Sequence, residues 1–351
     1  MRVLLAQNMP YRPGHGGATK SNRLLLEELA ARGHRCVAVT RGEAGVHTVA
    51  GVEVFAAAGP RLPKLVREVI AAEEPDRVLV PSDDPGLMVL GSALRAAPER
   101  VVYLVHTLQQ LPFGPRTFYP SQSGRRLVAR ARGIVSVSRA AHDYVLEHGG
   151  LESTVLYPHV YGPPPFPDLS DPSGPVTMVN PCGFKGLPIL LGLADARPDL
   201  RFRAVPTWGG IDPELATRPN IEIVAAAPDI ADVLRGSRAL LMPSLWDETF
   251  GYTAVEAMLH GIPVLAADVG GLREAMLGVP HLLPVNPITH YEPQRAGEAY
   301  PRPAVPPQNL VPWLEALDGI DVALSAQSRA AASAFVAGLD AGALEQYLVN
   351  L

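Results

Sequence analysis

Short apolar runs alternate with amphipathic helical segments along the first 157 residues. The segments with helical spacing are 18–32, 62–73, 86–96, 122–132 and 139–148. The apolar runs that precede and separate them have the length of buried strands and lie at 2–6, 35–40, 77–81, 101–105, 133–138 and 153–157. Apolar strands joined by helices predict parallel β-α-β units. We therefore expect a first α/β domain over residues 1–160.

The alternation stops at 157–175, where seven prolines fall within nineteen residues, so we expect a linker at 161–175. It then restarts with apolar runs at 176–180, 201–205, 221–225, 239–243, 263–267 and 281–284. These runs predict a second α/β domain over 176–324, and residues 325–351 are expected to form terminal helices. Two doubly wound domains would place ligands at the carboxyl ends of their strands, with the cleft between the domains as the default site.

Composition narrows the class of protein. The chain has 351 residues, 47% of them hydrophobic, and a net charge of −5. This balance excludes intrinsic disorder and gives no basic excess for nucleic-acid binding. The two cysteines are expected to be reduced thiols. No apolar run reaches the roughly 18 residues of a membrane span. We therefore expect a cytoplasmic protein without a transmembrane segment, for which peripheral membrane contact remains open.

Lysine is rare in this chain. Only Lys20, Lys64 and Lys185 occur among 30 basic residues. A bias towards arginine is typical of GC-rich coding sequences, so a retained lysine marks a position of interest. Lys185 stands at the start of the first helix expected in the second domain.

The stretch 242–276 carries the densest candidate chemistry. A strand ends at Pro243, and the loop after it holds Glu248. The next helix is expected from about residue 253, with Thr253 as its N-cap and Glu256 in its first turn. The amides of 251–253 would lie at this helix N-terminus, which is a ready site for a phosphate.

This stretch resembles glycosyltransferase family 4, the retaining nucleotide-sugar transferases with the GT-B fold. The resemblance rests on thirteen positions in one register: Glu248, Phe250, Gly251, Glu256, Ala257, Met258, Gly261, Pro263, Val264, Ala266, Gly270, Gly271 and Glu274. It implies two Rossmann-like domains that face each other across a cleft, the first binding the acceptor and the second the donor. It also implies that the last helix crosses back to the first domain.

The resemblance further implies which residues act. Lys185 would contact the donor diphosphate, Glu248 the donor sugar and Glu256 the ribose. Residues at the two helix starts would bind the donor through their backbones, namely Gly16, Gly17, Gly251, Tyr252 and Thr253. His106 would orient the sugar rather than act as a base. The sequence departs from the family at Asn180, where an arginine is usual, so one charge that would neutralise the diphosphate is missing.

No metal or cofactor is expected. The sequence has no D-x-D motif, and the acidic pair Asp83–Asp84 is interpreted as the cap of the following helix. The expected co-substrate is a nucleotide-diphosphate sugar, UDP-linked by family habit, which would react with an unidentified small-molecule, glycan or lipid acceptor. The leaving phosphate would take the acceptor proton.

Three alternatives remain open at this point. One is a GT-B protein that binds a nucleotide sugar without catalysis, which the change at Asn180 favours. A Rossmann-type oxidoreductase is weaker, because the glycines at 14 and 16 lack a third partner and strand 35–40 is followed by Arg41 rather than an acid. A P-loop over 14–21 is weaker still, because Thr19 stands where the motif needs glycine.

Overall fold

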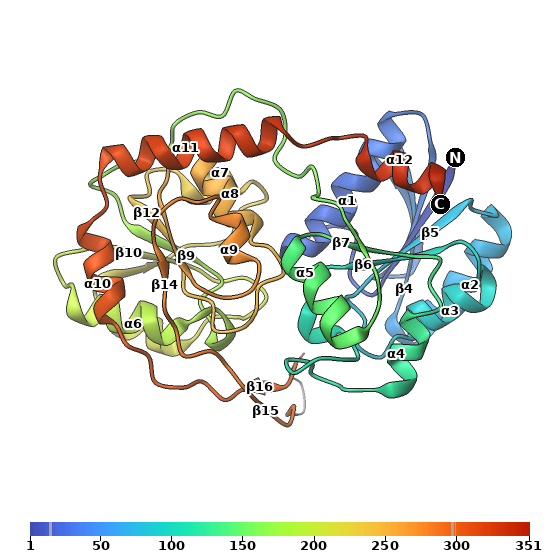
Figure 1. Ribbon diagram of the computed structural model, residues 1–351, viewed down its shortest axis with the longest axis horizontal. Helices are drawn as coiled ribbons and strands as arrows, with labels where there is room; N and C mark the ends of the chain where they lie inside the picture. The colour runs from blue at the N-terminus through green and yellow to red at the C-terminus, as the bar shows by residue number, and fades with distance from the viewer. Residues whose placement is uncertain (14–15, 296–297, 299) are drawn as a thin grey trace. The chain divides into compact units, whose positions relative to one another are not determined.

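The computed structural model describes residues 1–13, 16–295, 298 and 300–351. The chain divides into two compact units. Unit 1 contains Met1–Val160 together with Asp340–Leu351, and unit 2 contains Tyr161–Leu339. Figure 1 shows both units, each a twisted sheet with helices around it. The Pro-rich segment 161–175, expected as a linker, belongs to unit 2.

Unit 1 is built on an eight-stranded sheet of order β3-β4-β2-β1-β5-β6-β7-β8. Every neighbouring pair is parallel except β3 with β4, which is antiparallel. Its strands are β1 (Arg2–Gln7), β2 (Arg35–Arg41), β3 (Gly45–Val49), β4 (Val52–Ala57), β5 (Arg77–Pro81), β6 (Val101–Val105), β7 (Gly133–Ser136) and β8 (Thr154–Val155). Its helices are α1 (Gly16–Ala31), α2 (Leu62–Glu73), α3 (Met88–Ala96), α4 (Gln122–Val128), α5 (Arg139–Tyr144) and α12 (Ala343–Asn350).

Side chains of each strand alternate between two cores in unit 1. In β1, Leu4 contributes to the core beneath α2 and α3, whereas Leu5 contributes to the core beneath α1. Both residues are fully buried. Helices on both faces explain why the strands are continuous apolar runs, since a parallel sheet covered on both sides has no solvent face.

Helix α12 completes unit 1 from the far end of the chain. Leu348 is fully buried in the core beneath α1, and Leu344 and Tyr347 pack against the same core. The Arg77 side chain donates to the Leu348 carbonyl at 3.0 Å. The helices α1 and α12 lie side by side in Figure 1. The spacing of the three apolar side chains places them on one helix face.

Unit 2 is built on a six-stranded parallel sheet of order β11-β10-β9-β12-β13-β14. Its strands are β9 (Val176–Val179), β10 (Phe202–Val205), β11 (Ile221–Ile223), β12 (Ala239–Met242), β13 (Val264–Ala267) and β14 (Leu282–Leu283), with a separate hairpin of β15 (Tyr291–Glu292) and β16 (Arg302–Pro303). Its helices are α6 (Leu187–Ala196), α7 (Ile230–Leu234), α8 (Tyr252–Leu259), α9 (Leu272–Ala275), α10 (Val311–Asp318) and α11 (Val322–Ala337).

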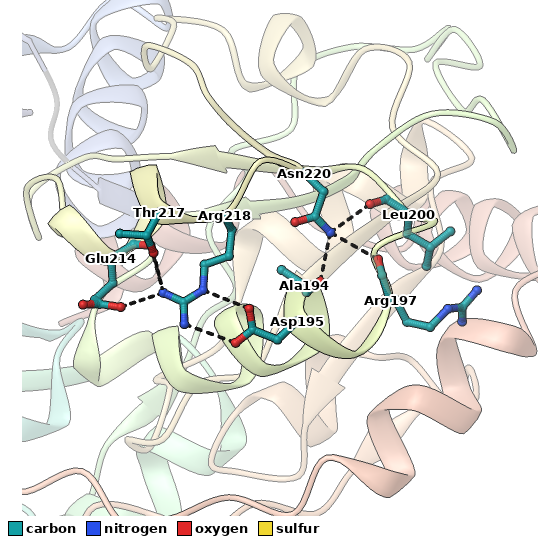
Figure 2. Close-up of polar contacts among 8 residues, drawn as sticks. All are labelled: Ala194, Asp195, Arg197, Leu200, Glu214, Thr217, Arg218 and Asn220. Atoms are coloured by element: carbon teal, nitrogen blue, oxygen red, sulfur yellow. Dashed lines mark hydrogen bonds and ion pairs between the residues drawn. The ribbon is translucent and has the colours of Figure 1, made fainter.

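A polar network fastens the end of α6 to the turn at 213–217 (Figure 2). Arg218 donates to both carboxylate oxygens of Asp195, at 3.1 and 3.2 Å, and to Glu214 at 2.6 Å. The Asn220 amide donates to three carbonyls, those of Ala194, Arg197 and Leu200. The Asn220 amide thus satisfies carbonyls that the end of α6 leaves without helical partners. The network joins the end of α6 to the neighbouring turn within unit 2.

The predicted alternation of strands and helices is confirmed in both units. Neither strand of the β3–β4 hairpin was predicted. The β3 side chains are exposed and give no buried pattern, whereas β4 is an apolar run with buried Val52 and Val54 that was not predicted as a strand. The Pro-rich segment 285–308 contains the antiparallel pair of β15 and β16. Within the described ranges, no helix combines the length and apolar character that a membrane crossing requires.

Candidate donor site in unit 2 and polar edge of unit 1

Lys185 and Glu248 meet at the carboxyl edge of the unit 2 sheet. Lys185 lies after β9, and Glu248 lies in the loop after β12, the strand beside β9. The Lys185 ammonium donates to Oε1 of Glu248 and forms an ion pair with it. The side chains are 19% and 12% exposed, so the pair is close to solvent yet mostly shielded from it. The structure thus brings together two of the residues that the sequence singled out.

Close backbone packing fixes the loops that carry this pair. Gly186 has a φ of +88°, and a Cβ there would come within 2.0 Å of the Pro243 carbonyl. At Gly271 a Cβ would come within 2.3 Å of the Thr249 carbonyl, and the Gly271 amide donates to the Glu248 carbonyl at 2.7 Å. Any larger residue at these positions would push the Glu248 loop away from Lys185.

Two further donors hold the Glu248 carboxylate. The Ser244 hydroxyl donates to its Oε1, and the Trp246 indole N–H donates to the same atom at 3.0 Å. Burial by itself would raise the pKa of Glu248, but Lys185, Ser244 and Trp246 together lower it below its ordinary value. Glu248 is therefore ionised at neutral pH. Sequence reasoning missed Ser244 and Trp246, and their only signal is proximity to Glu248 in the chain.

Aromatic side chains surround the ion pair. The Lys185 ammonium lies 4.9 Å from the centre of the Trp246 ring, within the range of a cation–π contact. Trp246 in turn lies 5.1 Å from Phe184 and 5.8 Å from Trp208, ring centre to ring centre. Trp208 is 36% exposed, so this aromatic cluster is partly accessible to solvent next to the Lys185–Glu248 pair.

Helix α8 begins at Tyr252, with Gly251 as its N-cap at a φ of +118°. This corrects the expectation that Thr253 is the N-cap: Thr253 is the second residue of the helix. In the described part of the chain, no side chain caps α8. Its first-turn amides, those of Tyr252 and Thr253 included, can therefore serve an anion.

Glu256 is 7% exposed and lies in the second turn of α8 rather than the first. The Tyr161 hydroxyl is near it: burial raises the pKa of Tyr161, and the charges of Tyr252 and Glu256 raise it further. No group among the described residues forms a hydrogen bond with this buried hydroxyl. No sequence motif points to Tyr161.

Asn180 joins the end of β9 to a neighbouring loop. Its φ is +59°, and it is 4% exposed. Its side-chain oxygen accepts from the Gly209 amide at 2.9 Å, which ties the end of β9 to the loop that carries Trp208. The side chain is thus engaged with that loop rather than with Lys185.

Gly16, Gly17 and His106 lie in unit 1. Gly16 opens α1 with a φ of +85°, and Gly17 follows it, exposed. His106 follows β6, is 8% exposed and lines a cavity of about 50 Å³ together with Ser21. Burial lowers the pKa of His106 to about 4, so its imidazole is neutral at pH 7. Gly14, which two of the alternative interpretations use, lies outside the described residues.

The acidic pair after β5 divides between two roles. Asp84 accepts from the Val89 amide at 2.7 Å and so caps the start of α3, as expected. Asp83 does not cap that helix; its Oδ1 accepts from the Asn8 amide at 3.3 Å. Across the described ranges, no three His, Cys, Asp or Glu side chains gather as a metal site would require.

Two family models match this chain. The model described as Glycosyltransferase Family 4 matches residues 15–160, and the model described as Glycosyl transferases group 1 matches residues 193–286. A D-inositol 3-phosphate glycosyltransferase of Streptomyces scabiei is 40% identical over 101 residues. That match covers 24% of this chain and 22% of the relative, so the chain spans about a fifth of the relative's length.

Solved structures are similar over nearly the whole chain. The sucrose-phosphate synthase of Thermosynechococcus elongatus gives a TM-score of 0.69 at 18% identity and covers 95% of this chain and 94% of its own. The Anabaena protein HepE, in complex with UDP and glucose, gives 0.67 at 19% identity, with 100% and 99% covered. The two doubly wound sheets therefore have the GT-B fold of these structures.

Proposed function

Since the chain belongs to glycosyltransferase family 4, we propose that it transfers a sugar from a nucleotide-diphosphate sugar, UDP-linked, to a small-molecule, glycan or lipid acceptor, with retention at the anomeric carbon. The observation that carries this proposal is the Lys185–Glu248 pair at the carboxyl edge of the unit 2 sheet. A cation, an ionised carboxylate and the N-terminus of α8 belong to the loops of one sheet edge. These are the groups that a sugar diphosphate needs.

Lys185 would stabilise the leaving group. Negative charge grows on the diphosphate as the anomeric bond breaks, and a cation already in place stabilises it most where water is excluded. In the structure the Glu248 carboxylate forms an ion pair with the Lys185 ammonium. The diphosphate would therefore take the Lys185 ammonium from Glu248 and leave the carboxylate to accept hydrogen bonds from the sugar hydroxyls.

Trp246 would keep Glu248 in position during this exchange. Its indole N–H donates to Oε1 at 3.0 Å in the structure and would keep this bond when Lys185 turns to the phosphate. Glu256, with the first-turn amides of α8, would bind the ribose and the diphosphate. In unit 1, the backbones at Gly16 and Gly17 would approach the substrates, and neutral His106 would orient the donor sugar without acting as a base.

The test is the release of nucleoside diphosphate from UDP-, GDP-, ADP- and dTDP-sugars, each incubated with the purified protein. We expect release from a UDP-sugar, and we expect the anomeric proton signal of the product in NMR to show retention. Tight UDP binding without release from any donor would instead support the non-catalytic alternative. Inversion at the anomeric carbon would contradict the proposed reaction.

A further inference from the structure

The Pro-rich segment between β14 and α10 forms an arm that is closed at its base. We define the Pro-rich arm as residues 285–292 and 300–308, which include β15 and β16. At the base, the Asn286 amide donates to Oε1 of Gln308 at 3.0 Å, and the Gln308 side-chain amide donates back to the Asn286 carbonyl at 2.8 Å. Prolines on both sides of the arm fix φ and so limit its backbone freedom.

The arm is joined by backbone hydrogen bonds to the two loops that carry Lys185 and Glu248. The Leu245 amide donates to the Phe184 carbonyl at 2.9 Å, and the Leu245 carbonyl accepts from the Ile288 amide at 2.7 Å. Leu245 and Ile288 are both fully buried. These bonds place the Lys185 loop, the Glu248 loop and the arm side by side, in that order.

The arm also packs closely on the turn Gly183–Lys185. A Cβ at Gly183 would come within 3.0 Å of Cγ of Pro303 and 3.2 Å of Cγ2 of Val305. Protein interiors leave little room for such an added atom, so a larger residue at 183 would push the arm away from the turn. The φ of Gly183 lies outside the left-handed region, so close approach rather than backbone conformation requires this glycine.

Two tyrosines of the arm extend the aromatic cluster around the ion pair. The Tyr291 ring lies 6.2 Å from the Phe184 ring, centre to centre. The Tyr300 ring lies 5.9 Å from the Trp208 ring. These distances are within the range of attractive aromatic pairs. Since Phe184 and Trp208 both contact Trp246, each tyrosine reaches Trp246 through one intervening ring.

Trp246 is where this cluster meets the charged groups. Its indole N–H donates to Oε1 of Glu248 at 3.0 Å, and its ring centre lies 4.9 Å from the Lys185 ammonium. A shift of the indole ring would therefore change both contacts at once. We propose that the Pro-rich arm is part of the donor site, and that its two tyrosines are positioning residues for Trp246.

This inference rests on the proposed function and adds the arm to the donor site. Because the tyrosines act through Trp246, they should affect Lys185 and Glu248, the groups expected to contact the diphosphate and the donor sugar. The ribose is expected at Glu256 on α8, which is not part of this aromatic cluster. Loss of a tyrosine ring should therefore weaken binding of a nucleotide sugar and of its diphosphate, and leave binding of the monophosphate unchanged.

The binding experiment compares UDP-glucose, UDP and UMP by isothermal titration calorimetry. In Tyr291→Leu we expect affinity for UDP-glucose and UDP to fall roughly tenfold, the effect of weakening a hydrogen bond to a charged group. Affinity for UMP should stay within about twofold of the wild type. Tyr119→Leu, at a tyrosine of unit 1 that is 40% exposed, is the control and should bind all three ligands normally. An equal loss for UMP would reduce Tyr291 to a structural role and overturn the inference.

A double-mutant cycle shows whether Tyr291 acts through Trp246. Trp246→Phe removes the indole donor to Glu248, so adding Tyr291→Leu to it should lower UDP-glucose affinity by less than about twofold more. Fully additive losses would mean that the tyrosine reaches the site by another route, which would contradict the proposed positioning role.

Indole N–H signals test the arm without any ligand. The chain has three tryptophans, so Trp246→Phe assigns the Trp246 signal in a ¹H–¹⁵N spectrum. Tyr291→Leu should shift this signal and speed the exchange of its proton with solvent. The Trp313 signal is the internal control, because that ring is fully buried and donates to the Pro284 carbonyl at 3.3 Å.

An unchanged Trp246 signal in Tyr291→Leu would overturn the inference, even if ligand affinity fell. Failure of the wild type to bind any nucleotide or to release diphosphate from any donor would count against the proposed function instead. The indole signals would still show whether the arm positions Trp246, so the two failures are distinguishable.

Discussion

The two sheets share a strand order and differ in the charge at their carboxyl edges. In unit 1 the central strands run β2-β1-β5-β6, and in unit 2 they run β10-β9-β12-β13, with corresponding connections. Asn8 follows β1 as Asn180 follows β9, and Asp83 follows β5 as the Glu248 loop follows β12. In both units an asparagine directly follows the first strand, and a carboxyl group lies in the loop after the neighbouring strand.

The neighbours of each carboxyl group determine whether it is ionised. Burial would raise the pKa of both, yet Lys185, Ser244 and Trp246 overcome this effect at Glu248 and lower its pKa. At Asp83, burial raises the pKa more than the amides of Asn8 and of Asp83 itself lower it, so the pKa rises to about 8. A doubly wound sheet therefore supplies a location for a carboxyl group, and the loop residues around it decide between an ionised and a neutral side chain.

The charged edge should be the more sensitive of the two to loss of one group. Lys185→Ala removes the cation that would meet the diphosphate, and we expect turnover to fall roughly 10²–10³-fold. Nucleoside diphosphate release under saturating donor measures it. Lys64→Ala is the matched control, because the Lys64 side chain is 65% exposed and forms an ion pair with Glu68 on its own helix. Near wild-type turnover in folded Lys185→Ala would remove the basis for a diphosphate site at this edge.

Asp83→Asn should stabilise the protein, and the gain should grow with pH. The folded pKa of Asp83, about 8, lies above the unfolded value near 4. Between pH 4 and pH 8 the unfolded wild type ionises more readily than the folded protein, so its unfolding free energy falls as the pH rises. The slope approaches about 1.4 kcal/mol per pH unit, and the gain levels off above pH 8. Denaturant unfolding from pH 4 to 9 measures it. If the difference in unfolding free energy between the two proteins stayed constant from pH 4 to 9, folding would not raise the pKa of Asp83.

Glu248→Gln should have the opposite sign. It leaves the Lys185 ammonium without its partner, and we expect a loss of about 1–3 kcal/mol in unfolding free energy at pH 7. Because the folded pKa of Glu248 is lowered, the wild-type advantage exists above the unfolded value and disappears as pH falls through the folded one. Parallel unfolding curves at pH 7 and at acid pH check this sign. A stabilised Glu248→Gln would mean that burial outweighs the ion pair.

The smallest expected contrast is between the stability effects of replacing Asn180 and Asn8. Asn180→Ala loses the bond to the Gly209 amide and puts alanine at a φ of +59°, so we expect about 1–2 kcal/mol of destabilisation. Asn8→Ala keeps the backbone amide that Asp83 accepts from, so we expect a change within about 0.5 kcal/mol. Thermal unfolding of both variants measures this contrast. Equal losses of stability in the two variants would contradict it.

The fold and several candidate site residues could be predicted from the sequence, because strand and helix periods and the spacing around Glu248 are local patterns. The interactions and conformations of those residues could not be predicted. The ion pair of Lys185 with Glu248, the turned conformation of Asn180 and the separate role of Asp83 depend on which loops the fold brings together. The β3 strand was missed for a simpler reason, since its exposed side chains produce no apolar period.

Helix α12 also bears on how the protein forms during synthesis. Unit 2 is one continuous stretch, Tyr161–Leu339, whereas unit 1 also contains Asp340–Leu351, whose Leu348 completes the core beneath α1. The ribosome makes most of unit 1 first, but the apolar face that α12 covers stays open until residues 340–351 emerge. Folding in order of synthesis would therefore complete the second unit before the first. A stalled or shortened chain would expose that face to chaperones and proteases.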